Sequence, residues 1–179
     1  MPHPPHPKAP MTVSPCDIPP TSQLDRHMIA AAYFRDAYRA PLRHQHPGVI
    51  PLFHAIFAHH PRWMKAILII RNKIASWCGL DAPTAAEIMN PNIAPRYRVG
   101  DKIGVWPIFA LTDTELIAGR DNAHLDFRVS VLREGDSVVV STICTTHNVF
   151  GKIYLAAIIP FHIWGVRHLL ARAGRAGRL

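Results

Sequence analysis

Two neighbouring segments of the chain carry polar side chains that could do chemistry, and both have the pattern of β-strands. Residues 124–131 and 137–147 are rich in β-branched residues and are joined at Glu134-Gly135, where glycine permits a tight hairpin turn. Because side chains alternate along a strand, one face of the hairpin gathers polar residues. They are His124, Asp126, Arg128, Ser141, Thr145 and His147. A carboxylate beside imidazoles could act as an acid–base pair or anchor the polar head of a ligand.

The pairing on this face depends on the register of the hairpin. We predict that Arg133 faces Asp136, so that Leu125 and the alternate residues after it form the core face. Asp126 and Arg128, two residues apart on one strand, can then pair with each other. We favour an ordinary ladder of polar pairs on a solvent-facing or partner-facing surface, because surface ion pairs are common and contribute at most about 1 kcal/mol. If strand curvature turns Asp126 inward, a ligand-binding or catalytic role is favoured instead.

A long apolar helix is predicted directly after the hairpin, beginning near Phe150. Its large side chains recur at intervals of three, four and seven residues, which predicts one buried stripe lying across the core face of the sheet. The stripe comprises Phe150, Ile153, Tyr154, Ala157, Phe161, Trp164 and His168. Pro160 removes a backbone donor inside the helix and predicts a kink. The apolar run is shorter than the roughly 20 residues that a membrane span needs, so we predict burial within the protein.

Four side chains on this helix are candidate ligand contacts, namely Tyr154, Phe161, His162 and Trp164. Aromatic residues at helical spacing usually belong to the core, and a buried histidine usually satisfies a local hydrogen bond. His162 stands apart because it follows Pro160, whose missing N–H leaves a carbonyl in need of a donor. We therefore favour a core role for these side chains and keep a ligand role as the alternative.

The composition bounds the class of protein. With 179 residues and 49% hydrophobic residues the chain suits one domain, and a net charge of +8 favours anionic partners or surfaces. Three cysteines without CxxC spacing, and no signal-peptide pattern, favour a reducing, cytoplasmic setting. The sequence has no HExxH, GxSxG or GxGxxG motif, so we predict no metal, no cofactor, no activated nucleophile and no sequence-specific nucleic-acid partner.

The remaining patterns place the hairpin in a single domain that spans residues 23–174. Residues 1–22, rich in proline and histidine, are predicted to form a disordered tail, and residues 175–179 a frayed basic tail that makes weak contact with anionic surfaces. Between the tails we predict, in order, a strand at 31–39, short helices at 49–59 and 62–78, a linker at 81–98, and strands at 102–111 and 115–120. The last two strands and the hairpin then form an antiparallel meander of four.

Five fragments of the chain carry a family resemblance: GDKIG at 100–104, HLDFR at 124–128, THN at 146–148, FGKIY at 150–154 and PFH at 160–162. In this order they resemble an uncharacterised bacterial domain family of the START-like, or Bet v 1-like, helix-grip type, over residues 24–173. The resemblance implies an α+β fold in which a curved antiparallel sheet grips a long kinked C-terminal helix, with two short helices after the first strand. In that family the domain also occurs fused behind short-chain-dehydrogenase-like, NAD(P)-binding epimerase domains.

The resemblance implies a function in binding, which we favour over catalysis. We expect a hydrophobic small molecule in a cavity between the sheet and the C-terminal helix, with the tentative site residues of the hairpin and the helix around it. One alternative is a cyclase-like or dehydratase-like enzyme that uses Asp126 with His124 or His147. Another is an interaction domain that acts with a separate NAD(P)-dependent oxidoreductase.

Overall fold

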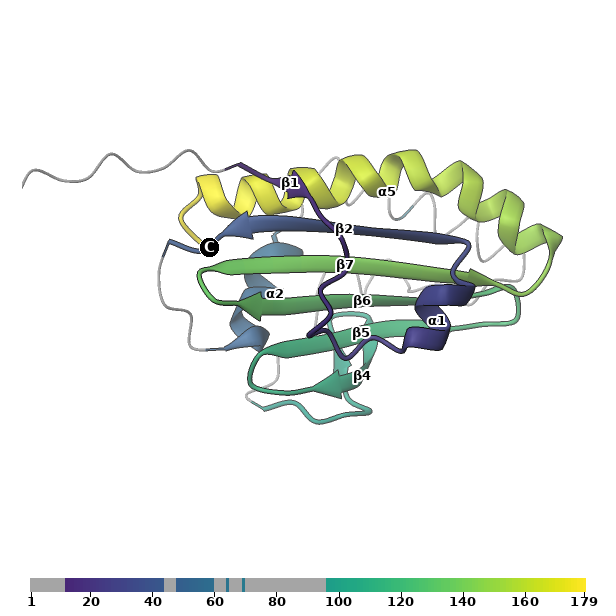
Figure 1. Cartoon of the computed structure of the whole chain (residues 1–179), viewed down its shortest axis with the longest axis horizontal. Coiled ribbons are helices and arrows are strands. Elements are labelled where there is room, and N and C mark those ends of the chain that lie inside the picture. The colour runs from purple at the N-terminus through teal and green to yellow at the C-terminus, as the bar shows by residue number, and fades with distance from the viewer. Residues whose placement is uncertain (1–11, 44–47, 60–63, 65–68, 70–95) are drawn as a thin grey trace, which may run out of the picture.

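A computed structural model describes residues 12–43, 48–59, 64, 69 and 96–179 of the chain. These residues form an α+β domain around a seven-stranded antiparallel sheet of order β1-β2-β7-β6-β5-β4-β3 (Figure 1). The elements are β1 Ser14–Pro15, α1 Arg26–Ala31, β2 Phe34–Pro41, α2 Val49–Phe57, β3 Lys102–Ile103, β4 Trp106–Leu111, β5 Glu115–Asp121, β6 Leu125–Glu134, β7 Ser137–Thr146 and α5 Val149–Arg175. The predicted α+β class and the four-stranded meander are confirmed.

The two-residue turn between β6 and β7 lies one residue later in the sequence than predicted. Glu134 pairs with Ser137, and Gly135 occupies the first central position of a two-residue turn with a φ of 56°. That position suits glycine in hairpin turns, and it moves the turn one residue along from the predicted pairing of Arg133 with Asp136. The predicted register is therefore wrong by two residues. Because the shift is even, every side chain keeps its predicted face.

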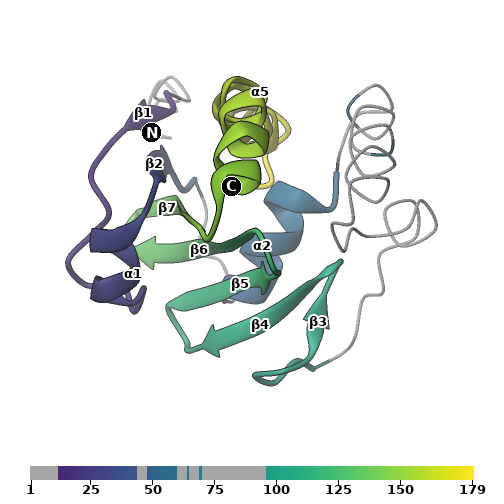
Figure 2. The same ribbon diagram turned by 90° about the vertical axis from the view of Figure 1, so that its right-hand side faces the viewer.

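Both faces of the sheet are covered, with α5 and α2 on one side and α1 on the other (Figure 2). The main core lies on the α5 side and is built from apolar residues of the strands and of both helices. It includes Leu52, Ile56, Leu116, Val129, Val131, Val138, Val140, Leu169 and Leu170. A smaller core lies under α1, where Leu24, Ile117 and Ile143 pack with Met28 and Ile29. The polar face of the hairpin is therefore on the side of the sheet that α1 covers.

The segment before α1 belongs to the fold, contrary to the prediction of a disordered tail over residues 1–22. β1 pairs with β2, and the following residues cross the sheet to Glu115, a carboxylate with 2% exposure. Ser22 Oγ and Ser130 Oγ each donate to Glu115 Oε1 at 2.5 Å, and the backbone N–H of Gln23 donates to Oε2 at 2.6 Å. A buried carboxylate needs such donors, so it fixes the segment in place. Residues 1–11 lie outside the described residues.

The predicted elements match the structure in type more often than in their bounds. The strand expected at 31–39 is β2, which begins only at Phe34, because Ala31 ends α1 and Ala32 is its C-cap. The N-cap of α1, Asp25, accepts from the backbone N–H of His27 at 2.8 Å. The helix expected at 49–59 is confirmed as α2. The strand expected at 102–111 is split into β3 and β4 at Gly104, which has a φ of 61°. Most of the predicted helix 62–78, all but residues 64 and 69, and most of the predicted linker 81–98 fall outside the described residues.

The helix α5 starts where predicted but buries a different side. Asn148 caps it by accepting from the backbone N–H of Gly151 at 2.9 Å, and a side chain at Gly151 would lie 2.2 Å from the carbonyl oxygen of His124. The first turn of α5 thus packs directly on the loop between β5 and β6, and this contact fixes the rotation of the helix about its axis. The buried side of α5 comprises Gly151, Leu155, Val166, Leu169, Leu170, Ala173 and Gly174. α5 is also long and apolar enough to cross a membrane, judged by length and composition alone.

The predicted buried stripe and the predicted basic tail are both wrong. Ile153, Phe161 and Trp164 are exposed on α5. At the C-terminus, Gly177 has a φ of 67° and the N–H of Arg178 donates to the carbonyl of Ala173 at 2.9 Å, which is the arrangement of a Schellman motif. This turn folds the last residues back on the core, where Leu179 is fully buried. Residues 175–179 therefore end the helix and pack, instead of fraying.

The hydrogen bonds of Glu115 predict a large effect of a small substitution. Glu115→Gln keeps the shape but replaces one acceptor oxygen with an amide that faces a donor, so the free energy of unfolding should fall by about 1–3 kcal/mol. Glu134→Gln is the matched control, because Glu134 pairs with Arg39 at 2.6 Å on the partly exposed surface and should cost less than about 1 kcal/mol. Urea unfolding measures both, and equal losses would contradict the anchoring role of Glu115.

A half-buried histidine of α2, His54, predicts a loss of stability in acid. Burial, and then the charge of His59, lower the pKa of His54, whose Nε2 lies 3.4 Å from the hydroxyl of Tyr97. The unfolded chain takes up a proton near the ordinary value of about 6.5, whereas the folded chain does so only at lower pH. The free energy of unfolding should therefore fall as the pH drops through about 6.5. Denaturation curves across this range should show a shallower decline for His54→Gln, and an unchanged slope would refute the assignment.

Candidate functional site

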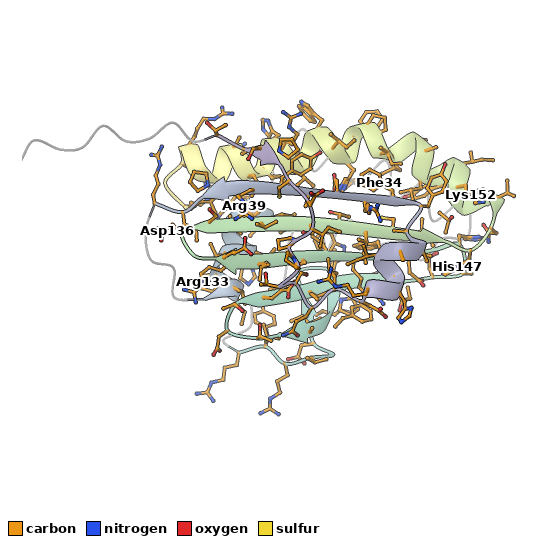
Figure 3. The ribbon with its side chains drawn as sticks, in the orientation of Figure 1. Phe34, Arg39, Arg133, Asp136, His147 and Lys152 are labelled. Carbon is orange, nitrogen blue, oxygen red and sulfur yellow. The ribbon has the colours of Figure 1, made fainter. Side chains whose placement is uncertain are left out.

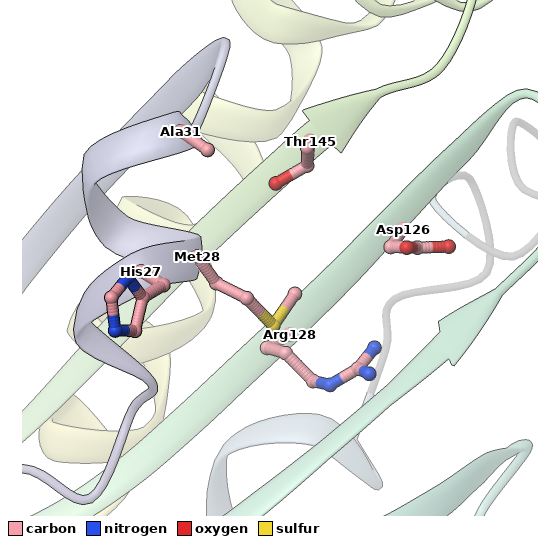
Figure 4. Close-up of a pocket in the computed structure, with 6 residues that line it drawn as sticks. All are labelled: His27, Met28, Ala31, Asp126, Arg128 and Thr145. Atoms are coloured by element: carbon pink, nitrogen blue, oxygen red, sulfur yellow. The ribbon is translucent and has the colours of Figure 1, made fainter.

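An open hollow lies on the α1 side of the sheet. It has a volume of about 300 Å³ and is lined by side chains of α1, β6 and β7 (Figure 4). The lining residues are His27, Met28, Ala31, Asp126, Arg128 and Thr145. Three of them belong to the polar face predicted from the sequence. The others come from α1, a helix that the sequence analysis did not predict, although Asp25 is a helix N-cap residue type.

Asp126, which lines the hollow, pairs with His147, which lies beside the hollow and does not line it. The imidazole Nε2 of His147 lies 3.0 Å from Asp126 Oδ2, and the two groups form an ion pair when the imidazole is protonated. Both side chains are part-exposed, so a proton or a ligand can reach them. His147 lies at the end of the sheet next to the start of α5, opposite the turn that holds Asp136 (Figure 3). The predicted acid–base partners are therefore together in space.

Arg128 pairs with Asp121 on β5, so the predicted pairing with Asp126 is wrong. Its guanidinium bonds both carboxylate oxygens of Asp121 and lies 3.5 Å over the ring centre of Phe109. The path to these partners is open because Gly119 lies opposite Arg128 in the register, and a side chain at Gly119 would meet the arginine stem at 3.0 Å. Asp121 and Asp126 face each other across the strands, and each has its own partner, Arg128 for Asp121 and His147 for Asp126.

Thr145 brings a hydroxyl group that has no partner among the described residues. Its Oγ1 is buried and makes no hydrogen bond, yet the residue lines the hollow. A buried hydroxyl without a partner is unfavourable by about 1–3 kcal/mol. Thr145 therefore offers a donor or an acceptor to whatever enters the hollow beside Asp126. No group of three or more metal-ligating side chains occurs in the part of the chain that the structure describes.

His124 has a structural role at the edge of this site. Its Nδ1 lies 2.9 Å from the amide Nδ2 of Asn148, and its carbonyl accepts from the N–H of His147 at 2.9 Å. Its ring also packs against Phe150 at 4.9 Å between centroids. These contacts tie the β5–β6 turn to the start of α5. His124 thus positions His147 and is not among the residues that line the hollow.

A comparison with protein-family models gives one match, to the family described as "Protein of unknown function (DUF2867)", over residues 28–169. The chain belongs to this family. This confirms the prediction of an uncharacterised domain family. No curated protein and no solved structure matches the chain. The range matched to the DUF2867 family includes the lining residues of the hollow from Met28 to Thr145, so the site lies within the family domain.

The helix candidates divide between two sides of α5. Phe161 and Trp164 point outward and Tyr154 is partly buried. His162 faces the sheet, where its Nε2 lies 3.4 Å from Asp36 Oδ1 and its ring meets Phe34 edge-on at 5.5 Å. The four residues therefore do not line one cavity.

A second polar cluster lies beneath α5, around Asp36 on β2. The second oxygen of Asp36 and the hydroxyl of its register partner Thr142 are buried without hydrogen bonds among the described residues. Burial, and then the charge of Asp36, raise the pKa of Tyr38. The sequence analysis missed Asp36, because an aspartate in a strand on its own has no partner spacing to mark it. The side chains of Asp36 and His162 are partly buried, with exposures of 11% and 24%, whereas the hollow under α1 is open.

Proposed function

We propose that this domain binds a small molecule with an apolar body and a hydrogen-bonding head, held in the hollow between α1 and the sheet. The observation that carries the proposal is the coincidence of the Asp126–His147 pair with the unpartnered hydroxyl of Thr145 at one place. Buried polar groups in native proteins are normally satisfied by protein, by water or by a ligand. A ligand head that bonds Thr145 and Asp126 would complete the site.

The remaining lining fits an apolar body. Met28 and Ala31 face the hollow from α1, and methionine adapts its shape to irregular apolar partners. The volume of about 300 Å³ lies at the lower end of ligand pockets, which suits a compact molecule. The proposal keeps the hydrophobic small molecule expected from the sequence, and it moves the site from the α5 side of the sheet to the α1 side.

We also propose that the fold is of the helix-grip type. Two features support it: the first long strand, β2, pairs with the last strand, β7, and the C-terminal helix α5 packs on both of them and on α2. The meander then runs from β7 to the opposite edge of the sheet. This arrangement leaves the α1 side as an additional covered face, which is where the proposed ligand lies.

The unpartnered hydroxyl gives a test with a matched control. Thr145→Val removes it and keeps the shape, so the free protein should gain about 1 kcal/mol of unfolding free energy, while ligand affinity should fall about tenfold. Thr142→Val removes a second buried hydroxyl of β7 that has no partner among the described residues, and it lies on the opposite face from Thr145. It should stabilise the free protein similarly and leave the affinity unchanged.

The measurement is thermal shift and native mass spectrometry with a panel of aromatic alcohols, terpenoid alcohols and alkylamines. The wild type should bind members of the panel that have one polar head and a compact apolar body. Equal responses of Thr145→Val and Thr142→Val to those members would place the ligand elsewhere.

The Asp126–His147 pair supports acid–base catalysis as a second candidate function. A carboxylate that orients an imidazole at 3.0 Å is the arrangement of a general base, and the hollow beside it could hold a substrate. The reaction class would be that of a dehydratase or cyclase. In the dehydratase case His147 would remove the proton next to a carbonyl group, the carbon–carbon double bond would form as the β-hydroxyl group leaves, and the imidazolium would return the proton to that group, so that water is released. Arg128 is already engaged with Asp121 and supplies no acid or base.

Substitution at His147 separates catalysis from binding. On a panel of β-hydroxy carbonyl compounds, the wild type should form the conjugated product, detected by its ultraviolet absorbance. His147→Gln should reduce the rate by about 100-fold or more, since general-base catalysis contributes about that much, with ligand binding retained. His162→Gln, on the other face of the sheet, should keep the full rate. A wild type that binds panel members but converts none would leave the domain a binding module.

A further inference from the structure

The outer side of α5 is an apolar surface that the proposed ligand site does not use. Five of the eight large apolar side chains exposed among the described residues lie on this helix, and they are Val149, Phe150, Ile153, Phe161 and Trp164. Ile153 is 66% exposed, Phe161 63% and Trp164 51%. A run of exposed large side chains on one element marks a surface for a partner or a membrane, because single exposed ones are ordinary.

These side chains form one stripe opposite the packed side of the helix. With about 100° of rotation per residue, Ile153, Pro160 and Trp164 fall within roughly 40° of one another. The buried residues Leu155 and Val166 fall on the opposite side. α5, which runs along the sheet beside β2 (Figure 1), is therefore held to the sheet by one side. Its second apolar side faces outward.

The ionic side chains of α5 all have the same sign. Residues Val149–Arg175 contain Lys152, Arg167, Arg172 and Arg175, all exposed, and no aspartate or glutamate. Three of the four lie after Trp164, whose ring stacks on His168 at 5.2 Å. The apolar stripe thus leads into a basic end with a tryptophan at the boundary, and tryptophan favours interfaces between apolar and aqueous phases.

We propose that the outer side of α5 docks on an anionic membrane surface, with the helix lying in the plane of the interface. Its apolar stripe would enter the boundary of the acyl chains, and its arginines would meet phospholipid headgroups. The helix meets the length and composition of a membrane span, but Leu155, Val166 and Leu169 hold it against the sheet. In-plane docking uses the exposed side and leaves that packing intact.

The charges favour a membrane over a second copy of the chain. Two copies joined through this side would bring eight cations of α5 together with no carboxylate on either helix to balance them. An anionic bilayer supplies both the apolar phase and the opposite charge. The overall charge of +8 acts in the same direction.

Vesicle co-sedimentation of the full chain tests this surface. The protein should bind vesicles of equal parts phosphatidylcholine and phosphatidylglycerol, at least tenfold more tightly than phosphatidylcholine alone, and high salt should release it. The triple variant Ile153→Ser, Phe161→Ser and Trp164→Ser should lose at least tenfold in binding. The matched control is Tyr33→Ser with Val99→Ser, which removes two exposed apolar side chains outside α5 and should bind as the wild type does.

Two further measurements test whether a loss of binding comes from unfolding, and whether the basic residues contribute to binding. Circular dichroism melts establish that the triple variant is folded, and Arg172→Gln with Arg175→Gln, which alters no apolar residue, should weaken binding to the anionic vesicles alone. Equal binding to both vesicle types, or unchanged binding of the triple variant, would overturn the proposal. A dimer in sedimentation velocity that the triple variant abolishes, without vesicle binding by the wild type, would assign the surface to a second copy and also overturn it.

Discussion

The buried carboxylate of Glu115 is the interaction on which the second face of the sheet depends. A carboxylate removed from water is unfavourable unless donors surround it, and its donors here come from Ser22, Gln23 and Ser130. Two of these belong to the chain segment just before α1. Satisfying Glu115 therefore holds that segment on the sheet, and α1 follows as a cover over Ile117 and Ile143. Without this anchor the hollow would have no second wall.

The two sides of the sheet consequently have different characters. The α5 side is filled by the main core, and its polar cluster around Asp36 is partly buried. The α1 side has a smaller core and ends in the open hollow beside Asp126. The long helix adds an outer surface that is apolar and basic. A domain built this way can hold a small molecule on one side while its helix engages a surface on the other, because the sheet separates the two sites.

The sequence predicts which segments form strands and helices better than it predicts the register of the strands and the rotation of the helices against the sheet. Alternation of β-branched residues identified β6 and β7 and assigned their faces, since an even shift in register preserves them. The buried side of α5 could not be predicted in this way, because a helix with apolar residues on every side has no distinct stripe. Its rotation is set by a tertiary contact, Gly151 against the carbonyl of His124. The same holds for the C-terminus, where Gly177 turns Leu179 into the core.

The candidate site shows how a tertiary contact can reverse an argument made from local pattern. Asp126 and Arg128 are neighbours on one face of β6, so pairing between them is the simplest prediction. Because Gly119 has no side chain, Arg128 can reach Asp121 and pairs with it. Asp126 pairs with His147 instead. A surface ladder would need no ligand, but α1 covers this face and buries the hydroxyl of Thr145 beside the pair. The cover changes Asp126 from a surface carboxylate into part of the lining of the hollow, which is the proposed binding site.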